Sequence, residues 1–192
     1  MTMAESIIED EVFERVDYTN RALPKGEYEH CTFLNCDFSG SDLAGVVFME
    51  CTFRECNLSM ANLRGTALKD VKFSNCKLLG LSFNNCSSFL LSVGFEDCVL
   101  NLASFYKLKL KNTAFKNCSL READFTEADL TKASFENCDL ASVTFDGSVL
   151  EKADFRMAYN YSINPENNRM KGARFSADGL AGLLDKYKLV IS

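Results

Sequence analysis

Cysteine pairs are the first residues in this sequence that suggest chemistry. The stretches CTFLNC at 31–36 and CTFREC at 51–56 each carry two thiols five residues apart. Repeated thiols at a fixed spacing are typical of structural metal sites and of disulfide frameworks. The chain has nine cysteines, an odd number, and its one histidine is His30. A single histidine argues against most zinc sites and against most histidine-based catalysis.

The cysteines follow a five-residue repeat that explains them without sulfur chemistry. Every fifth residue is Phe or Leu from Phe33 to Phe83, and again from Phe95 to Phe155. The residue two positions before each Phe or Leu is Ala, Ser, Thr, Val or Cys, and Leu81 is one of two larger exceptions. All nine cysteines occupy this small position, Cys86 included if the first frame is extended. We therefore interpret them as reduced, buried core residues, and we predict no catalytic residue, no metal and no cofactor.

A second period of twenty residues lies above the first. Cys36, Cys56 and Cys76 are twenty residues apart, and the same spacing returns after two residues are inserted between Phe83 and Phe95. Four pentapeptides therefore make one coil of a repeat architecture. An Asn, Asp or Glu precedes each cysteine of this column, as in LNC, SNC and KNC, and stacked Asn side chains can form hydrogen bonds along such a column.

The pattern, seen in EADFT, EADLT and KADFR, resembles the pentapeptide-repeat family over residues 28–158. This resemblance implies an all-β fold, a right-handed quadrilateral parallel β-helix with one pentapeptide on each side. We expect residues 1–27 to form an acidic N-terminal cap and the two extra residues to form a bulge near 84–94. At about 4.8 Å per coil, the repeat would make a rod of roughly 31 Å.

Residues 159–192 break the repeat and predict a short helix and a tail. Ser176 is a suitable N-cap for this helix. The stretches NPENNR and GLLDKYKLVIS look like the C-terminal part of the Qnr, MfpA and microcin-immunity type of family member, which implies a homodimer through the C-terminus. The expected interface residues are Leu180, Leu183, Leu184, Tyr187, Leu189 and Ile191.

The charge balance bears on the partner. A net charge of −6 argues against direct binding of nucleic acid and allows approach to a basic, DNA-binding protein. No segment reaches membrane-spanning length and the first residues lack a signal-peptide pattern, so we expect a cytoplasmic protein without a membrane partner.

The resemblance implies a non-enzymatic DNA mimic that binds a type II topoisomerase, DNA gyrase or topoisomerase IV, and lowers sensitivity to quinolones. Acidic residues precede the large position in many repeats, where most serve the fold. The candidates for partner binding are Asp124, Asp129, Asp139 and Asp154. The alternative is a scaffold that binds another protein through its flat faces. Carboxylates at fixed spacing are automatic in such a repeat and give little support to an enzyme.

Overall fold

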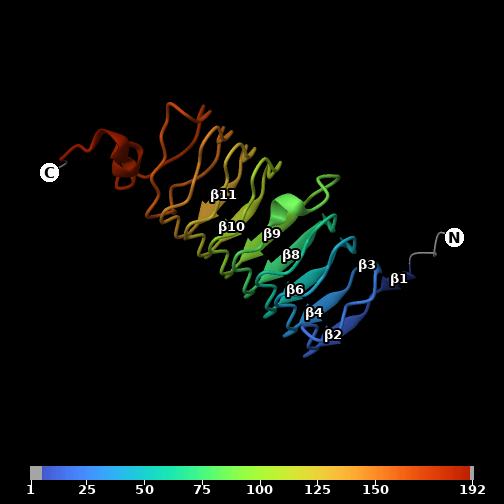
Figure 1. The fold of residues 1–192 in the computed structure, drawn as a ribbon. Coiled ribbons are helices and arrows are strands. Elements are labelled where there is room, and N and C mark those ends of the chain that lie inside the picture. The colour runs from blue at the N-terminus through green and yellow to red at the C-terminus, as the bar shows by residue number, and fades with distance from the viewer. Residues whose placement is uncertain (1–5, 191–192) are drawn as a thin grey trace.

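The protein is a rod of stacked coils in a computed structural model that describes residues 6–190 (Figure 1). Its strands form two parallel sheets, ordered β1-β3-β5-β7 and β2-β4-β6-β8-β9-β10-β11. The predicted all-β, right-handed, four-sided parallel β-helix is confirmed. The strands are β1 (Ser6–Glu9), β2 (Val12–Glu14), β3 (Gly26–Glu29), β4 (Thr32–Leu34), β5 (Val47–Met49), β6 (Thr52–Arg54), β7 (Ala67–Lys69), β8 (Val71–Ser74), β9 (Val93–Glu96), β10 (Ala114–Lys116) and β11 (Ser134–Glu136).

Each coil has four sides, which we number in chain order. Face 1 begins at residue 6, face 2 at 11, face 3 at 16 and face 4 at 21, and the cycle returns to face 1 at residue 26. Face 1 carries the four-stranded sheet and face 2 the seven-stranded sheet. Isolated parallel bridges, such as Asp17 with Asp37 and Asp42 with Asn62, join the coils on faces 3 and 4.

The large residues of the repeat fill the interior as ladders of stacked rings. On face 2, neighbouring ring centroids lie 4.7–5.4 Å apart from Phe13 to Phe175. A second ladder on face 4 runs from Phe83 to Phe145 and meets the first ladder edge to face. Offset stacks and edge contacts are the favourable geometries for aromatic pairs. The five-residue period therefore determines the core.

A left-handed residue ends most sides and turns the chain into the next one. Asn35, Asn75, Asn117 and Asn137 have φ between 51° and 54°, a conformation that Asn tolerates better than most residues. The expected ladder of side chains is present in the later coils, where Asn137 donates to Asn117 at 3.2 Å and Asn117 donates to Asp97 at 3.0 Å. The Asn column thus serves the turns of the rod.

The thiols are buried in the core of the rod. All nine cysteines are free, and burial raises the pKa of Cys51 and of Cys86 to about 12, so these two stay protonated. The Cys56 thiol donates to the Phe33 carbonyl at 3.3 Å. Ser148 makes the same contact with the Phe125 carbonyl at 2.8 Å. The small position therefore accepts a thiol or a hydroxyl in one role.

Replacing Cys56, Cys98 or Cys118 by alanine should each lower the free energy of unfolding by only about 1 kcal/mol, the cost of a small cavity. Alanine already fills this position at Ala123 and Ala153. Urea titration of each variant measures the change. Unfolding of the wild-type protein by a metal chelator would contradict this interpretation of the thiols.

The rod extends beyond both predicted boundaries of the repeat. β1 and β2 pair in register with β3 and β4, so residues 6–25 form a full coil where we expected a cap. Phe13, Tyr18 and Leu23 keep the five-residue frame there. At the other end, a parallel β-bridge between Asp154 and Arg174 continues face 2 beyond residue 158.

The two inserted residues form a projecting loop on face 1. This side has seven residues, 86–92, instead of five, and we call the whole segment the insertion. It follows the 3-10 helix η1 (Phe83–Asn85) and projects from the middle of the rod (Figure 1). Phe89 and Leu90 are 70% and 63% exposed. Pairing resumes at once, because β9 pairs with β8 through Val93 and Val71.

The predicted C-terminal helix is instead two short 3-10 helices, η2 (Leu180–Leu183) and η3 (Asp185–Tyr187). Ser176 still receives a hydrogen bond, from the Gly179 amide at 3.2 Å. Gly179 and Gly182 weaken an α-helix, and the Gly182 carbonyl accepts a hydrogen bond from Ile163 N at 2.9 Å. The segment therefore follows the end of the rod instead of forming a regular helix.

Candidate protein-binding surfaces

The four aspartates predicted to bind a partner do not form one surface. Asp154 lies on face 2, Asp139 on face 3, Asp124 on face 4 and Asp129 on face 1. All four are half-buried, and each carboxylate accepts a hydrogen bond from the backbone amide two residues later, at 2.9–3.1 Å. This is the geometry of an Asx turn. Their main task is therefore to hold the turns.

Two of these carboxylates also form ion pairs with basic side chains. Burial works to raise the pKa of Asp129, but hydrogen bonds from Thr131 and the nearby Lys111 keep it below its ordinary value. The Arg156 guanidinium, whose Nη2 lies 2.7 Å from the Asp154 Oδ2, holds the pKa of Asp154 below its usual range. Both groups are charged at neutral pH and already paired, which leaves them little charge to offer a partner.

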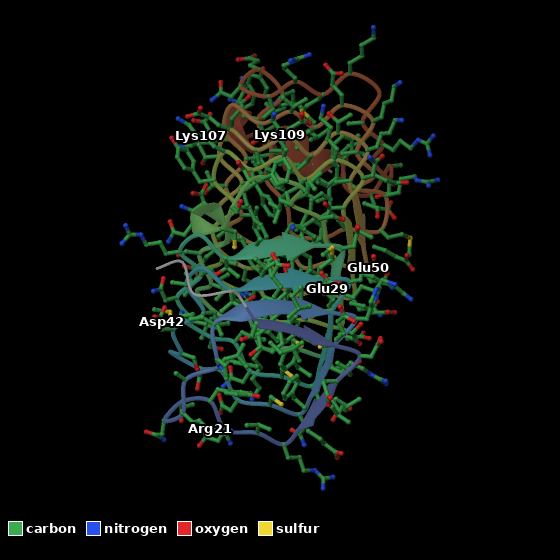
Figure 2. All side chains as sticks on the ribbon, turned by 90° about the vertical axis from the view of Figure 1, so that its right-hand side faces the viewer. Arg21, Glu29, Asp42, Glu50, Lys107 and Lys109 are labelled. Carbon is green, nitrogen blue, oxygen red and sulfur yellow. The ribbon has the colours of Figure 1, made fainter. Side chains whose placement is uncertain are left out.

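Face 1 carries the strongest separation of charge. We call its part before the insertion the acidic half and its part after the insertion the basic half. The acidic half has one lysine, Lys69, against the acids Glu9, Asp10, Glu27, Glu29, Glu50 and Asp70. The basic half has two acids, Asp129 and Glu151, against the bases Lys109, Lys111, Lys132, Lys152, Arg169 and Lys171. In Figure 2, Glu29 and Glu50 lie over the first coils and Lys109 over a later one.

Most charges of the acidic half are not neutralised within the described chain. Glu50 lies 3.5 Å from His30, and Asp70 accepts a hydrogen bond from Ser92 at 2.6 Å. Within residues 6–190, Glu9, Glu27 and Glu29 make no ion pair with a Lys or Arg side chain. The acidic half therefore presents carboxylates that a basic protein can contact.

The other faces mix both signs. Face 2 alternates acids and bases, as where Lys116 pairs with Glu96 at 2.7 Å. Face 3 carries Asp17, Asp37, Glu122 and Asp139 with Lys77 and Arg121. On face 4, Lys107 pairs with Glu127 at 3.4 Å. No unbroken acidic stripe runs along the described rod, so the acidic half is the densest candidate surface. The position of an acid within its pentapeptide does not reveal the acidic half. Sorting the acids by their position in the twenty-residue coil does reveal it.

The C-terminal segment exposes much of the apolar set predicted for a dimer. Leu180, Tyr187 and Leu189 are 50%, 52% and 59% exposed. Leu183 and Leu184 are half-buried, and Leu183 packs on the core. Ile191 lies outside the described residues. These side chains form an apolar end to the rod with no cover in the described chain.

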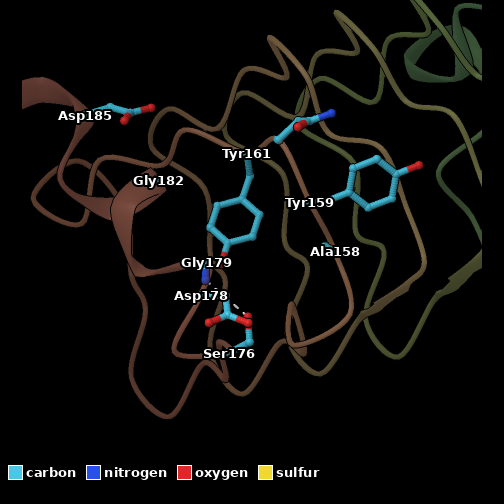
Figure 3. A pocket seen from close by; sticks show the side chains of 9 residues that line it. Ala158, Tyr159, Tyr161, Ser176, Asp178, Gly179, Gly182 and Asp185 are labelled. Atoms are coloured by element: carbon cyan, nitrogen blue, oxygen red, sulfur yellow. Dashed lines mark hydrogen bonds between the residues drawn. The ribbon is translucent and has the colours of Figure 1, made fainter. Parts of the chain in front are cut away.

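Contacts to the last coil position this segment. Tyr187 donates to Glu166 at 2.8 Å, and Lys186 forms an ion pair with the same carboxylate. Between segment and rod lies a hollow of about 440 Å³ that includes Asp178 and Asp185 (Figure 3). The Tyr161 hydroxyl is buried beneath Gly179 with no hydrogen-bond partner among the described residues. Because Gly179 and Gly182 have no side chain, the C-terminal segment can approach Tyr161 this closely.

Other kinds of site find no support in the part of the chain that the structure describes. No group of three or more His, Cys, Asp or Glu side chains there is placed to hold a metal ion. No helix within residues 6–190 is long and apolar enough to cross a membrane. The surfaces of interest are thus the acidic half, the basic half and the apolar C-terminal end.

Comparisons with known proteins agree with the fold. A family model described as a pentapeptide repeat region matches residues 26–88 and 87–159. Two solved structures of QnrB1, described as a plasmid-mediated fluoroquinolone resistance protein, are similar to this chain. A trypsin-treated variant has 17% identity, TM-score 0.62 and coverage of 95% of this chain and 99% of that one. The full-length form has 18% identity, TM-score 0.55 and coverage of 96% and 100%. No curated protein matches the sequence. At these identities, the likeness shows a shared fold.

Proposed function

This chain belongs to the pentapeptide-repeat proteins, and we propose that it is a non-enzymatic rod that binds a basic surface on another protein. The observation that carries the proposal is the acidic half of face 1, where six acids face one lysine. Carboxylates clustered this densely on one surface attract a basic partner and steer its approach. The filled core of the rod leaves no room for a substrate among the repeats, which favours binding over catalysis.

The partner we propose is a type II topoisomerase, DNA gyrase or topoisomerase IV, to which the rod presents itself as a mimic of DNA. The support is the fold shared with QnrB1, which is described as a fluoroquinolone resistance protein, together with the acidic half. In the acidic half, Glu9 and Glu29 share one column and Glu50 and Asp70 share the next, so the carboxylates of each pair lie about 4.8 Å apart on successive coils. A groove that binds DNA phosphates through Lys and Arg offers the complementary charge.

We further propose that two chains pair through their C-terminal ends. The exposed Leu180, Tyr187 and Leu189 support this, because pairing would remove apolar surface from water. It would also cover the open edge of the last coil, where unpaired backbone groups invite association. Two rods joined end to end would present an acidic half near each far end.

A scaffold for a different protein is the second candidate function. It is favoured by the mixture of signs on faces 2 and 4 and by the basic half, which a DNA mimic does not require. A scaffold would bind its partner through flat faces without competing with DNA. The two functions therefore differ in what DNA does to the complex.

Supercoiling by purified gyrase should fall as this protein is added, and added DNA should restore it. The triple variant Glu27→Lys, Glu29→Lys, Glu50→Lys should need about tenfold more protein for the same effect, because charge complementarity is lost. Higher salt should weaken the effect of the wild-type protein.

The matched control is Glu55→Lys, Glu122→Lys, Glu136→Lys, which changes the same number of charges on faces 2 and 3 and should behave like the wild type. The assay is repeated with a quinolone to follow the cleaved complex. If supercoiling and cleavage are both indifferent to a large excess of the protein, topoisomerase binding is rejected and the scaffold takes its place.

A further inference from the structure

The two halves of face 1 lie symmetrically about the insertion. Face 1 recurs nine times along the rod, and we call each recurrence a rung. The insertion is the fifth rung, with four rungs before it and four after it. The rungs are residues 6–10, 26–30, 46–50, 66–70, 86–92, 108–112, 128–132, 148–152 and 168–172.

This symmetry makes face 1 complementary to itself. A two-fold axis that lies in the interface, parallel to face 1 and at right angles to the rod, and that passes over the insertion would place each rung opposite the rung equally far from the other end of a second copy. Rung 1, with Glu9 and Asp10, would then meet rung 9, with Arg169 and Lys171. An isologous interface needs this kind of match, in which one patch meets its own copy. We propose that face 1 is a docking surface for a second, antiparallel copy of this chain.

Rungs 2 and 3 follow the same pairing, whereas rung 4 carries both Lys69 and Asp70 opposite the lysines of rung 6. Rung 2 carries Glu29 and rung 8 carries Lys152, while rung 3 carries Glu50 and rung 7 carries Lys132. Lys132, Lys152 and Lys171 have no ion-pair partner among the described residues, so they are available to a second copy. A parallel arrangement would instead place each half against its own sign. Charge therefore selects the antiparallel orientation.

The insertion supplies an apolar centre to this interface. Phe89 and Leu90 are largely exposed, while the neighbouring Leu91 packs against the core and anchors the loop. The two-fold axis would bring the two copies of this loop together and shield their apolar side chains from water.

The interface would be narrow and would depend on charge. Nine rungs at about 4.8 Å give a strip about 40 Å long, and one pentapeptide side makes it only about 10 Å wide. Such a strip lies at the low end of specific interfaces, where affinity is modest. The pairing should therefore respond strongly to salt. It uses the side of the rod, so it is separate from the end-to-end pairing proposed above and does not rest on topoisomerase binding.

Analytical ultracentrifugation of the full chain at high micromolar concentration tests the proposal. The average mass should rise about twofold when salt is lowered from about 1 M to about 0.01 M, because the Debye length grows from about 3 Å to about 30 Å. The high-salt mass gives the baseline for any apolar pairing at the C-terminus. A mass that is independent of salt overturns the proposal.

Charge exchange gives the sharper test. The first variant, Glu9→Lys, Glu27→Lys, Glu29→Lys, makes the acidic half basic; the second, Lys132→Glu, Lys152→Glu, Lys171→Glu, makes the basic half acidic. Each alone should lose the salt-dependent rise, since like charges would face each other. An equal mixture should recover it, because the first variant's basic surface meets the second's acidic surface.

The control variant Arg64→Glu, Lys72→Glu, Lys77→Glu changes three bases on the other faces and should keep the salt-dependent rise. Circular dichroism confirms that each variant is folded before its mass is compared. Failure of the mixture to recover the rise overturns the proposal, as does loss of the rise in the control. The second variant leaves the acidic half unchanged, so topoisomerase binding can fail or succeed independently of this result.

Discussion

Replacing Phe115 by alanine should lower the free energy of unfolding by about 3–5 kcal/mol, the range for a large aromatic side chain lost from a packed core. Phe115 is fully buried, and its ring stacks between Phe95 at 5.1 Å and Phe135 at 5.0 Å. It also meets the face-4 ladder edge to face, at 5.8 Å from Phe125. The substitution interrupts the face-2 ladder and removes its edge contacts with the face-4 ladder, and the stacked coils leave no side chain free to fill the cavity.

The loss can be measured by urea unfolding, with Phe89→Ala as the matched control. Phe89 has the same side chain but projects from the insertion, 70% exposed, so its removal should change stability by less than about 0.5 kcal/mol. A repeat rod depends on contacts between neighbouring coils, and a break in the middle can also split the transition into two steps. A Phe115→Ala protein as stable as Phe89→Ala would show that the ladders do not hold the rod together.

Replacing Gly182 by alanine should displace the C-terminal segment and convert the proposed end-to-end dimer into a monomer. A Cβ at this position would overlap the Tyr161 carbonyl oxygen and press on the Tyr161 ring. Because backbone atoms cannot move aside as a flexible side chain can, the hydrogen bond from Ile163 N to the Gly182 carbonyl should be lost. Leu180 and Leu189 would then no longer be held in place at the end of the rod.

Light scattering should therefore give about twice 21.5 kDa for the wild type and 21.5 kDa for Gly182→Ala, both at about 1 M salt to suppress charge pairing. Gly94→Ala is the control, because a Cβ at Gly94 would have no heavy atom within 4 Å and its φ is not positive. A wild-type protein that is monomeric, or a Gly182→Ala protein that remains a dimer, would reject pairing through the C-terminus.

Much of the fold could be predicted because five residues make one side and twenty make one coil. The period alone assigns Phe115 to the interior and Asn117 to a turn, and it explains the cysteines by size. The extra coil at residues 6–25 follows the same frame through Phe13 and Tyr18, but its outward residues Ile7 and Val12 weaken the pattern because they remain exposed. End coils pack on one side only and so show the repeat less clearly.

The candidate surface was harder to predict for a geometric reason. Consecutive pentapeptides lie on different sides, so Asp124 and Asp129 are close in sequence yet project from different faces. Residues that share a face are twenty apart, and 22 apart across the insertion, as Val71 and Val93 show. The helix predicted in the C-terminal segment is wrong for another reason: Leu180, Leu183 and Leu184 suit an α-helix in spacing, but Tyr161 packs against Gly179 and Gly182.

The pairing of Val71 with Val93 on either side of the insertion also bears on how such a rod can change its length during evolution. A gain of twenty residues would add one storey and leave every later side chain pointing as before. A gain of five would rotate everything downstream by a quarter turn and move the lysines after the insertion to a different side from the glutamates before it. The gain of two residues does neither, because the loop accommodates both residues within one coil. Small insertions of this kind can therefore decorate the rod without changing the direction in which any other residue faces.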